Sequence, residues 1–354
     1  GHRTPPNTKE KNGQTLNSIQ RYTSSGEEME KPPEKIIHNP RVYAEEGYLK
    51  AFFWTEFQNE ELNIGLKRHP YYIKISTIIS YCSLDNRFIK LCVNNALAVS
   101  EEVIVTYCSH LFDGTPEDTT MIEELKREFP TVKYVPFEWH EGKRARYWHT
   151  TSRIKGQEAV DENIDWIHFV DADEIIDPEL FSAFLNEPQT YDYAMYRFAS
   201  HWYFREPTYQ AKPSKSFRGG DMLFHEQASV LIRKEFSCME PELDTEREQL
   251  HHCAYCSSSM YKGKELYNVK WFGVPMLHHF SWCRTKEEML RKAELFGHGD
   301  GAVWSQTTQL KDGAPKKDWK TLIEEEFSGD FSGTDFIHGY DYDIVEDKFG
   351  IGRL

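Results

Sequence analysis

Apolar residues between positions 71 and 170 alternate between short β-branched or aromatic runs and longer stretches with a helical period. The run YYIKISTIISY at 71–81 is typical of a strand, whereas Phe88 and Cys92 mark one face of a helix four residues apart. The pattern predicts strands at residues 71–81, 103–107, 132–135 and 166–170, with a helical stretch between successive strands. This alternation indicates an α/β fold with a doubly wound, mostly parallel sheet, whose ligands bind beyond the carboxyl ends of the strands.

After about residue 180 the alternation weakens and the aromatic connections lengthen. The pattern there predicts strands at 191–198, 228–233 and 274–282, and helices at 286–296 and 316–327. Three regions follow from these patterns. We expect an N-terminal extension at 1–66 that is partly flexible or packed on the domain, a main domain at 67–300, and a C-terminal helix and tail packed on that domain at 301–354.

Composition narrows the class of protein. Apolar residues make up 39% of the chain and aromatic residues 14%, which suffices for a packed core and excludes wholesale disorder. No stretch reaches the roughly 20 consecutive apolar residues of a membrane span, and the polar start GHRTPPNTKEKNGQ does not resemble a signal peptide. We therefore expect a soluble, cytoplasmic protein, and the seven cysteines fit a reducing compartment. The formal charge of −15 makes nucleic acid an unlikely partner.

The clearest chemical signal is WIHFVDADEIIDP, in which an apolar strand runs directly into Asp171 and Asp173. In an extended chain these two side chains would point to the same side, at a loop mouth outside the core. Carboxylate oxygens at a strand's carboxyl end suit a hard divalent cation, Mn²⁺ or Mg²⁺. Such an ion can hold a substrate diphosphate and neutralise it as it leaves. A solvated turn is the alternative explanation for so short a motif.

In this order and spacing, residues 70–300 resemble the glycosyltransferases of GT-A fold, most closely the glycosyltransferase family 2 group. ISTIISYCSLDNRFIKLCVNNAL resembles the first strand and helix of that family, VKYVPFEW its third strand, and WIHFVDAD its Asp-x-Asp strand. EEVIVTYCSHLFDGTPED resembles its second strand, with an Asp-Gly-Thr turn at 113–115. One departure leaves the donor nucleotide open, because Cys108, Ser109 and His110 replace the acidic pair that the family carries after this strand.

The resemblance implies a GT-A-like fold with an irregular acceptor-side half, and further site residues. HFSWCR resembles a late strand whose histidine completes the metal site, which points to His279, with His278 packing on the opposite side. Asp113 would lie near the nucleotide. The residues predicted to contact the donor, several of them through its phosphates, are Asp113, Arg146, Arg153, Asp171 and Arg284. Exposed helix faces or surface ion pairs are the alternatives for the arginines.

The function predicted is metal-dependent transfer of a sugar from a nucleotide-diphosphate sugar to the hydroxyl of a carbohydrate or glycoconjugate acceptor, with inversion of configuration. An inverting transfer needs a carboxylate base after the metal strand, and RGGDMLFHEQ offers Glu226, which we favour, and Asp221. The alternative is a retaining transfer without such a base, in which both acids are solvated loop residues. Trp202 and Tyr203 are candidates to stack on an acceptor sugar, although core packing would also explain Tyr203.

Other classes remain open at this stage. A sugar-nucleotide pyrophosphorylase is disfavoured, because SYCSLDNRF after the first strand contains no glycine for a phosphate loop. A non-catalytic carbohydrate- or protein-binding domain would not need both aspartates. A glycosyltransferase acting on modified DNA bases would need a basic groove despite the −15 charge. The single CxxC at Cys253 and Cys256, beside two histidines, is a weak zinc motif.

Overall fold

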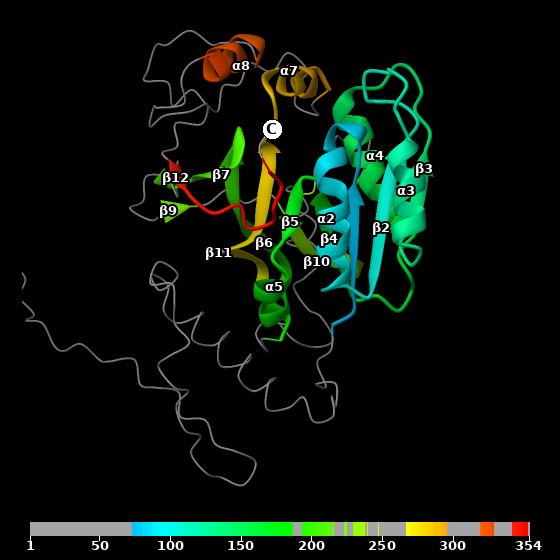
Figure 1. Ribbon diagram of the computed structural model, residues 1–354. Helices are drawn as coiled ribbons and strands as arrows, with labels where there is room; N and C mark the ends of the chain where they lie inside the picture. Colours follow the sequence, from blue (N-terminus) through cyan, green and yellow to red (C-terminus); the bar gives the residue numbers. More distant parts are fainter. Residues whose placement is uncertain are drawn as a thin grey trace, which may run out of the picture. The chain divides into compact units, whose positions relative to one another are not determined.

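The chain's computed structural model, drawn in Figure 1, is described for ten segments that lie within the compact unit Gly65–Leu354. These segments are residues 73–186, 193–212, 214–215, 223–224, 229–237, 239, 247, 267–295, 319–328 and 342–352. The predicted base residues Asp221 and Glu226, the pair Cys253 and Cys256, and the extension at 1–66 lie outside them.

Four parallel strands form one half of the sheet, in the spatial order β4-β1-β2-β3. They are β1 (Ile75–Ser80), β2 (Glu102–Cys108), β3 (Lys133–Phe137) and β4 (Trp166–Asp171). Helices α2 (Asn86–Leu97), α3 (Thr120–Glu128) and α4 (Ala145–Glu158) connect them in turn, and the short helix η3 (Ser83–Asp85) precedes α2. The predicted α/β class and its doubly wound parallel strands are confirmed.

The second half of the main sheet is largely antiparallel, and its longest strand pairs with register shifts. The order continues from β4 through β10 (Val230–Arg233), β6 (Tyr193–Phe204), β7 (Glu206–Ala211) and β12 (Tyr342–Ile344). The long strand β11 (Tyr267–Trp282) runs parallel to β6 and pairs with the short β5 (Glu174–Ile176). The strands β8 (Ser214–Lys215) and β9 (Leu223–Phe224) form a separate pair. The pattern missed β5 and β12, which have three residues each, and β7, whose sequence EPTYQA shows no alternation of apolar and polar residues.

Further helices cover this half. They are α5 (Pro178–Leu185), η5 (Lys234–Phe236), α7 (Lys286–Leu295) and α8 (Trp319–Ser328). The start of α5 is encoded locally: the side chain of Asp177 accepts a hydrogen bond from the N–H of Leu180, and Pro178 fills the first helical position. In the described residues, no helix has both the length and the apolar character that a membrane crossing requires.

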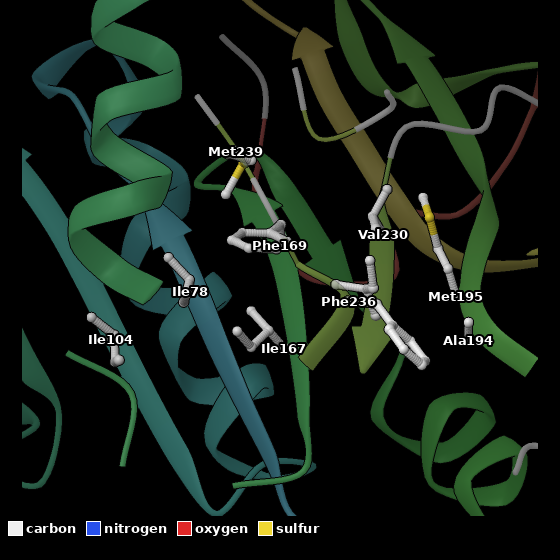
Figure 2. Packing of buried hydrophobic residues seen from close by; sticks show 10 residues of the cluster. Ile78, Ile104, Ile167, Phe169, Ala194, Met195, Val230, Phe236 and Met239 are labelled. Atoms are coloured by element: carbon white, nitrogen blue, oxygen red, sulfur yellow. The ribbon is translucent and has the colours of Figure 1, made fainter. Parts of the chain in front are cut away.

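One hydrophobic cluster crosses the centre of the sheet and joins its two halves (Figure 2). It runs from Ile104 on β2 through Ile78 on β1 and Phe169 on β4 to Met195 on β6. Helix α4 packs closely over it: a Cβ on Gly156 would lie 2.3 Å from Cγ2 of Ile78. Thr106 of β2 lies 3.1 Å from the same Cβ, so this close packing fixes the height of α4 above β1 and β2. The site lies at the carboxyl ends of β1 and β4.

Candidate active site

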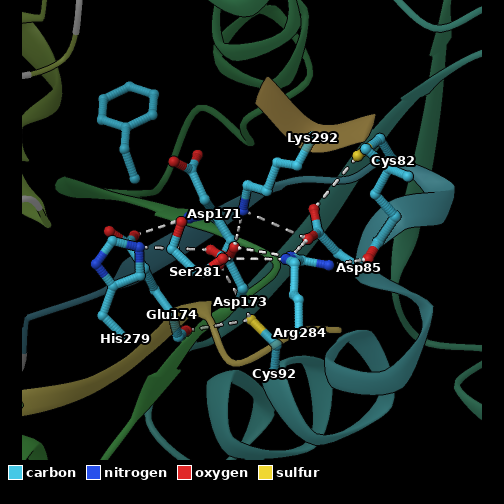
Figure 3. Close-up of polar contacts among 12 residues, drawn as sticks. Cys82, Asp85, Cys92, Asp171, Asp173, Glu174, His279, Ser281, Arg284 and Lys292 are labelled. Carbon is cyan, nitrogen blue, oxygen red and sulfur yellow. Dashed lines mark hydrogen bonds and ion pairs between the residues drawn. The ribbon is translucent and has the colours of Figure 1, made fainter. Parts of the chain in front are cut away.

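A cluster of polar side chains around Asp171 and Asp173 lies at the point where the order of the parallel strands changes direction. Strand β1 pairs with β2 on one side and with β4 on the other, so the chain leaves β1 and β4 toward different sides of the sheet. The carboxyl ends at such a switch point are where α/β sheets bind ligands. Figure 3 shows that the cluster draws its side chains from η3, the end of β4, β11 and α7.

Asp173 is the centre of this cluster. Its Oδ2 lies 2.5 Å from Nζ of Lys292 and 3.1 Å from Nη2 of Arg284, and its Oδ1 lies 3.6 Å from Nε2 of His279. Burial alone would raise the pKa of Asp173, but the charges of Lys292, His279 and Arg284 outweigh that effect and hold the pKa well below its usual range. Only 3% of its side chain is exposed, so the expectation of an exposed loop mouth is wrong for Asp173.

Asp171 faces a different set of basic side chains. Its Oδ1 lies 3.0 Å from Nη2 of Arg153 and 3.5 Å from Nε2 of His149, and its Oδ2 lies 3.4 Å from Nη2 of Arg247. Burial would raise the pKa of Asp171, but Arg247 and Arg153 lower it well below the usual value. The carboxylate is therefore ionised, and 25% of its side chain is exposed.

The prediction that Asp171 and Asp173 extend to the same side is wrong. Strand β4 ends at Asp171, and the chain turns through Ala172 and Asp173 before β5 begins. The alternation of side chains along an extended strand therefore applies as far as Asp171 and does not reach Asp173. The turn directs the two carboxylates to two different groups of cations.

Glu174 is a buried carboxylate that supports Asp171. It forms a two-point ion pair with Arg247, with both N–O distances 2.6 Å, and its Oε2 accepts a hydrogen bond from the N–H of Asp171 at 2.8 Å. The exposed fractions of the Glu174 and Arg247 side chains are 0% and 2%. This buried pair fixes the backbone at the start of the turn.

Arg284 links three segments of the site. Its side chain is 1% exposed and contacts Asp85 of η3, Asp173 after β4 and the carbonyl oxygens of Leu84 and Ser281. The alternative of a surface salt bridge is therefore wrong. These contacts hold Asp173 in place, while a contact of Arg284 with a phosphate stays a prediction.

The two neighbouring histidines on β11 have different surroundings. His279 pairs in register with Glu174 of β5, and the N–H of Phe280 donates to the carbonyl of Asp173 at 2.9 Å, which brings His279 beside the Asp173 carboxylate. His278 is buried on the opposite side and shares a 2.7 Å hydrogen bond with the Tyr203 hydroxyl. Burial lowers the pKa of His278, so this ring is held neutral.

The donor-side predictions are placed as follows. Asp113 lies in a turn whose Thr115 N–H donates to it at 2.9 Å, and Arg291 of α7 pairs with its Oδ2 at 3.1 Å. Arg153 is buried against Asp171, so the alternative of an exposed helix face is wrong for it. Arg146 is half-buried in the first turn of α4. Roles in nucleotide binding for these three residues stay predictions.

The acceptor-stacking prediction for Trp202 and Tyr203 is wrong. Each is 4% exposed. Trp202 packs edge-on against Trp282, and Tyr203 stacks on Phe280 with ring centroids 4.6 Å apart. Both rings belong to the apolar packing between β6 and β11, so they have no free face for a sugar.

The sequence reasoning missed several charged residues of the site, among them Lys292 and Glu117. Lys292 reaches Asp173 from 119 positions further along the chain. Glu117 follows a loop in which His110 and Pro116 pair, and its carboxylate accepts a hydrogen bond from the N–H of Ser83, just beyond β1. Burial raises the pKa of Glu117 to about 7. No acidic pair follows β2 directly at the strand end, whereas Glu117 approaches Ser83 of η3 several residues later.

Comparisons with known proteins give distant likenesses only. No model of a protein family matches the sequence, and a search of curated proteins finds no match. Among solved structures, the chain is similar to S. aureus TarS 1–349, with 13% identity, coverage of 72% of this chain and 71% of that chain, and a TM-score of 0.38. It is also similar to the mannosyltransferase PcManGT from Pyrobaculum calidifontis in complex with GDP-Man and Mn²⁺, with 12% identity, 81% and 79% coverage, and a TM-score of 0.38.

A third similar structure is the 4-diphosphocytidyl-2C-methyl-D-erythritolsynthase from Anaerococcus prevotii DSM 20548, with 10% identity, 63% and 98% coverage, and a TM-score of 0.32. TarS and the mannosyltransferase are GT-A-type glycosyltransferases, the class that the sequence resembles. All three TM-scores are below 0.5, so these likenesses carry no conclusion about activity.

Proposed function

We propose that this protein is a glycosyltransferase that moves a sugar from a nucleotide-diphosphate sugar to an acceptor hydroxyl, with a divalent cation, Mn²⁺ or Mg²⁺, at Asp173 and His279. The acceptor hydroxyl attacks the anomeric carbon while the bond to the diphosphate breaks. A carbohydrate or glycoconjugate is the acceptor class that we propose.

The observation that carries this proposal is the convergence of Asp173 and His279 at the switch point of the sheet. An ionised carboxylate and an imidazole face each other there at 3.6 Å, beside the basic groups Arg284 and Lys292. Oxygen and imidazole donors suit a divalent ion, and basic groups suit a diphosphate. Their place, at the carboxyl ends of β1 and β4, is where a nucleotide ligand of such a sheet binds.

Asp173 and His279 suit an ion whose coordination shell is completed by the substrate. Within the described ranges, no three or more His, Cys, Asp or Glu side chains are arranged together to hold a metal. Mg²⁺ is commonly held through one or two carboxylates together with substrate phosphates, so a two-residue protein contribution is sufficient. When bound, the ion would neutralise the charge that develops on the leaving diphosphate. Asp171 as a direct ligand stays a prediction, since its oxygens contact Arg153, His149 and Arg247.

The remaining chemistry requires a base on the opposite face of the sugar. We retain Glu226, ahead of Asp221, as the group that takes the acceptor's proton in an inverting transfer. NMR of the product's anomeric configuration tests the inversion. Turnover of Glu226→Gln tests the base, because loss of the carboxylate would abolish proton removal while donor binding persists.

The test of the function is a donor screen with UDP- and GDP-sugars in the presence of Mn²⁺. We expect metal-dependent release of the nucleoside diphosphate from one of them, and loss of this activity in Asp173→Asn. Titration calorimetry of Mn²⁺ should show a loss of affinity greater than about 100-fold in Asp173→Asn, above the range seen for outer-sphere groups. The loss should be smaller in His279→Ala, where water can replace the imidazole.

The matched control is Asp161→Asn, which removes an exposed carboxylate after α4. It should bind Mn²⁺ and turn over like the wild type. Because Asp173 is buried among cations, melting curves must show that Asp173→Asn is folded, and His279→Ala gives an independent reading if it is not. Wild-type Mn²⁺ affinity in both folded variants would exclude this metal site.

A further inference from the structure

Lys292 is the most displaceable cation in the cluster around Asp173 and Asp171. Its ammonium lies 2.5 Å from Oδ2 of Asp173 and 4.0 Å from Oδ1 of Asp85, and 14% of its side chain is exposed. Arg284, which shares Oδ2 of Asp173, is 1% exposed and also bound to two backbone carbonyls. An ammonium on a flexible four-carbon stem can change partner at lower cost than such a buried, multiply bonded guanidinium.

Among the described residues, and with His149 and His279 in the neutral form, the cluster is electrically balanced without a metal ion. Its carboxylates and its cations are equal in number within the described residues joined by these contacts, namely Asp85, Asp171, Asp173 and Glu174 against Arg153, Arg247, Arg284 and Lys292. A divalent ion on Asp173 would add two positive charges within a few ångströms of Lys292. Like charges at that distance repel strongly in a partly buried site, so the ion and the ammonium compete for Asp173.

The backbone that carries Lys292 is fixed independently of this contact. Arg291 of the same helix pairs with Asp113 at 3.1 Å, and Glu288 pairs with Arg87 of α2 at 2.7 Å. The ammonium of Lys292 can therefore leave Asp173 while α7 stays in place. A negatively charged group arriving beside Asp173 would then be within reach of this side chain.

We propose that Lys292 is the exchangeable counter-ion of Asp173: the metal displaces its ammonium from the carboxylate, and the ammonium then pairs with the diphosphate of the donor. This inference rests on the proposed function, since it takes Asp173 as a metal ligand. It has a thermodynamic consequence. The metal binds weakly by itself, and the metal and the nucleoside diphosphate each increase the affinity of the other.

The experiment measures binding rather than turnover. Mn²⁺ binding to the full chain is followed by the electron paramagnetic resonance signal of free Mn²⁺, for the wild type, Lys292→Met and Lys292→Gln. We expect both variants to bind Mn²⁺ at least about tenfold more tightly than the wild type, equivalent to about 1.4 kcal/mol. UDP or GDP in saturating Mn²⁺ should bind at least about tenfold more weakly to both variants, because the diphosphate has lost its cation.

The opposite signs of these two changes separate exchange from a structural role, which would weaken both affinities. Lys286→Met, at the start of the same helix, is the matched control and should change neither. Lys292→Arg keeps the charge and should retain weak Mn²⁺ binding. The amide of Lys292→Gln can still donate a hydrogen bond to Asp173. This variant therefore supplies the two affinities if Lys292→Met does not fold.

The outcomes also distinguish this inference from the proposed function. If Asp173→Asn loses Mn²⁺ but both neutral variants of Lys292 keep the wild-type affinity, the exchange is wrong and the metal site stands. If folded Asp173→Asn binds Mn²⁺ as the wild type does, the metal site itself is wrong, and the exchange fails with it.

Discussion

The buried pair of Glu174 and Arg247 should be among the most costly contacts to break. Each nitrogen–oxygen distance is 2.6 Å, and neither side chain is more than 2% exposed. Removing one partner of such a pair leaves an uncompensated buried charge, which costs roughly 3–5 kcal/mol. Glu174→Gln leaves Arg247 with Asp171 at 3.4 Å and the carbonyl of Phe169 at 3.0 Å, so we expect the lower end, about 3 kcal/mol.

Arg247→Met should cost more, about 4–5 kcal/mol, because it removes the cation that Glu174 and Asp171 share. The double variant Glu174→Gln/Arg247→Met leaves fewer unpaired charges than the sum of the single changes. Its cost should therefore fall below that sum by at least about 1 kcal/mol, which is the coupling that a double-mutant cycle measures.

Urea unfolding at neutral pH, with the slope checked for each variant, gives these free energies. Glu123→Gln is the control, since it breaks the exposed pair with Lys126, whose N–O distance is 2.8 Å, and it should change stability by at most about 1 kcal/mol. A loss below about 1 kcal/mol for Glu174→Gln, or strict additivity in the double variant, would refute the reasoning that the pair supports the turn.

Two further predictions concern packing and pH. Gly156→Ala should destabilise the fold by about 1–3 kcal/mol in urea unfolding, because its Cβ would lie 2.3 Å from Ile78 and 3.1 Å from Thr106; a gain in stability, the usual result in a helix, would contradict this packing. Glu117 has a folded pKa of about 7, above its unfolded value near 4.3, so its contribution favours folding below pH 4 and is lost as pH rises through 7. The melting temperature of Glu117→Gln should not show this decline with rising pH. If the melting temperatures of variant and wild type fall in parallel, a group other than Glu117 causes the decline.

The sequence predicted the parallel half of the fold because the relevant signals are local. Apolar runs predicted β1, β2, β3 and β4, and their alternation with helices indicated where the carboxyl ends meet. The position of Asp171 at the end of β4, with Asp173 just beyond it, followed from the same signal. Each of these inferences needs only neighbouring residues.

The charge partners could not be predicted in the same way. Asp173 meets Lys292 across 119 positions, and Glu174 meets Arg247 across 73. Lysines and arginines are frequent on any helix, so nothing local distinguishes a cation that closes a site from one that faces solvent. The turn at Asp173 also depends on the distant strand β11, because the N–H of Phe280 donates to the carbonyl oxygen of Asp173.

The shared contact of Arg284 and Lys292 with Asp173 gives the site a sequence fingerprint. Seven residues separate the two cations, and α7 begins between them. Inserting one residue in the first turn of α7 would rotate Lys292 by about 100° and shift it by about 1.5 Å along the axis, away from the carboxylate. Chains that use the same charge arrangement should therefore combine Asp-x-Asp-Glu with a downstream Arg-x₇-Lys of invariant length. That pair of spacings can separate them from proteins in which an Asp-x-Asp is merely a solvated turn.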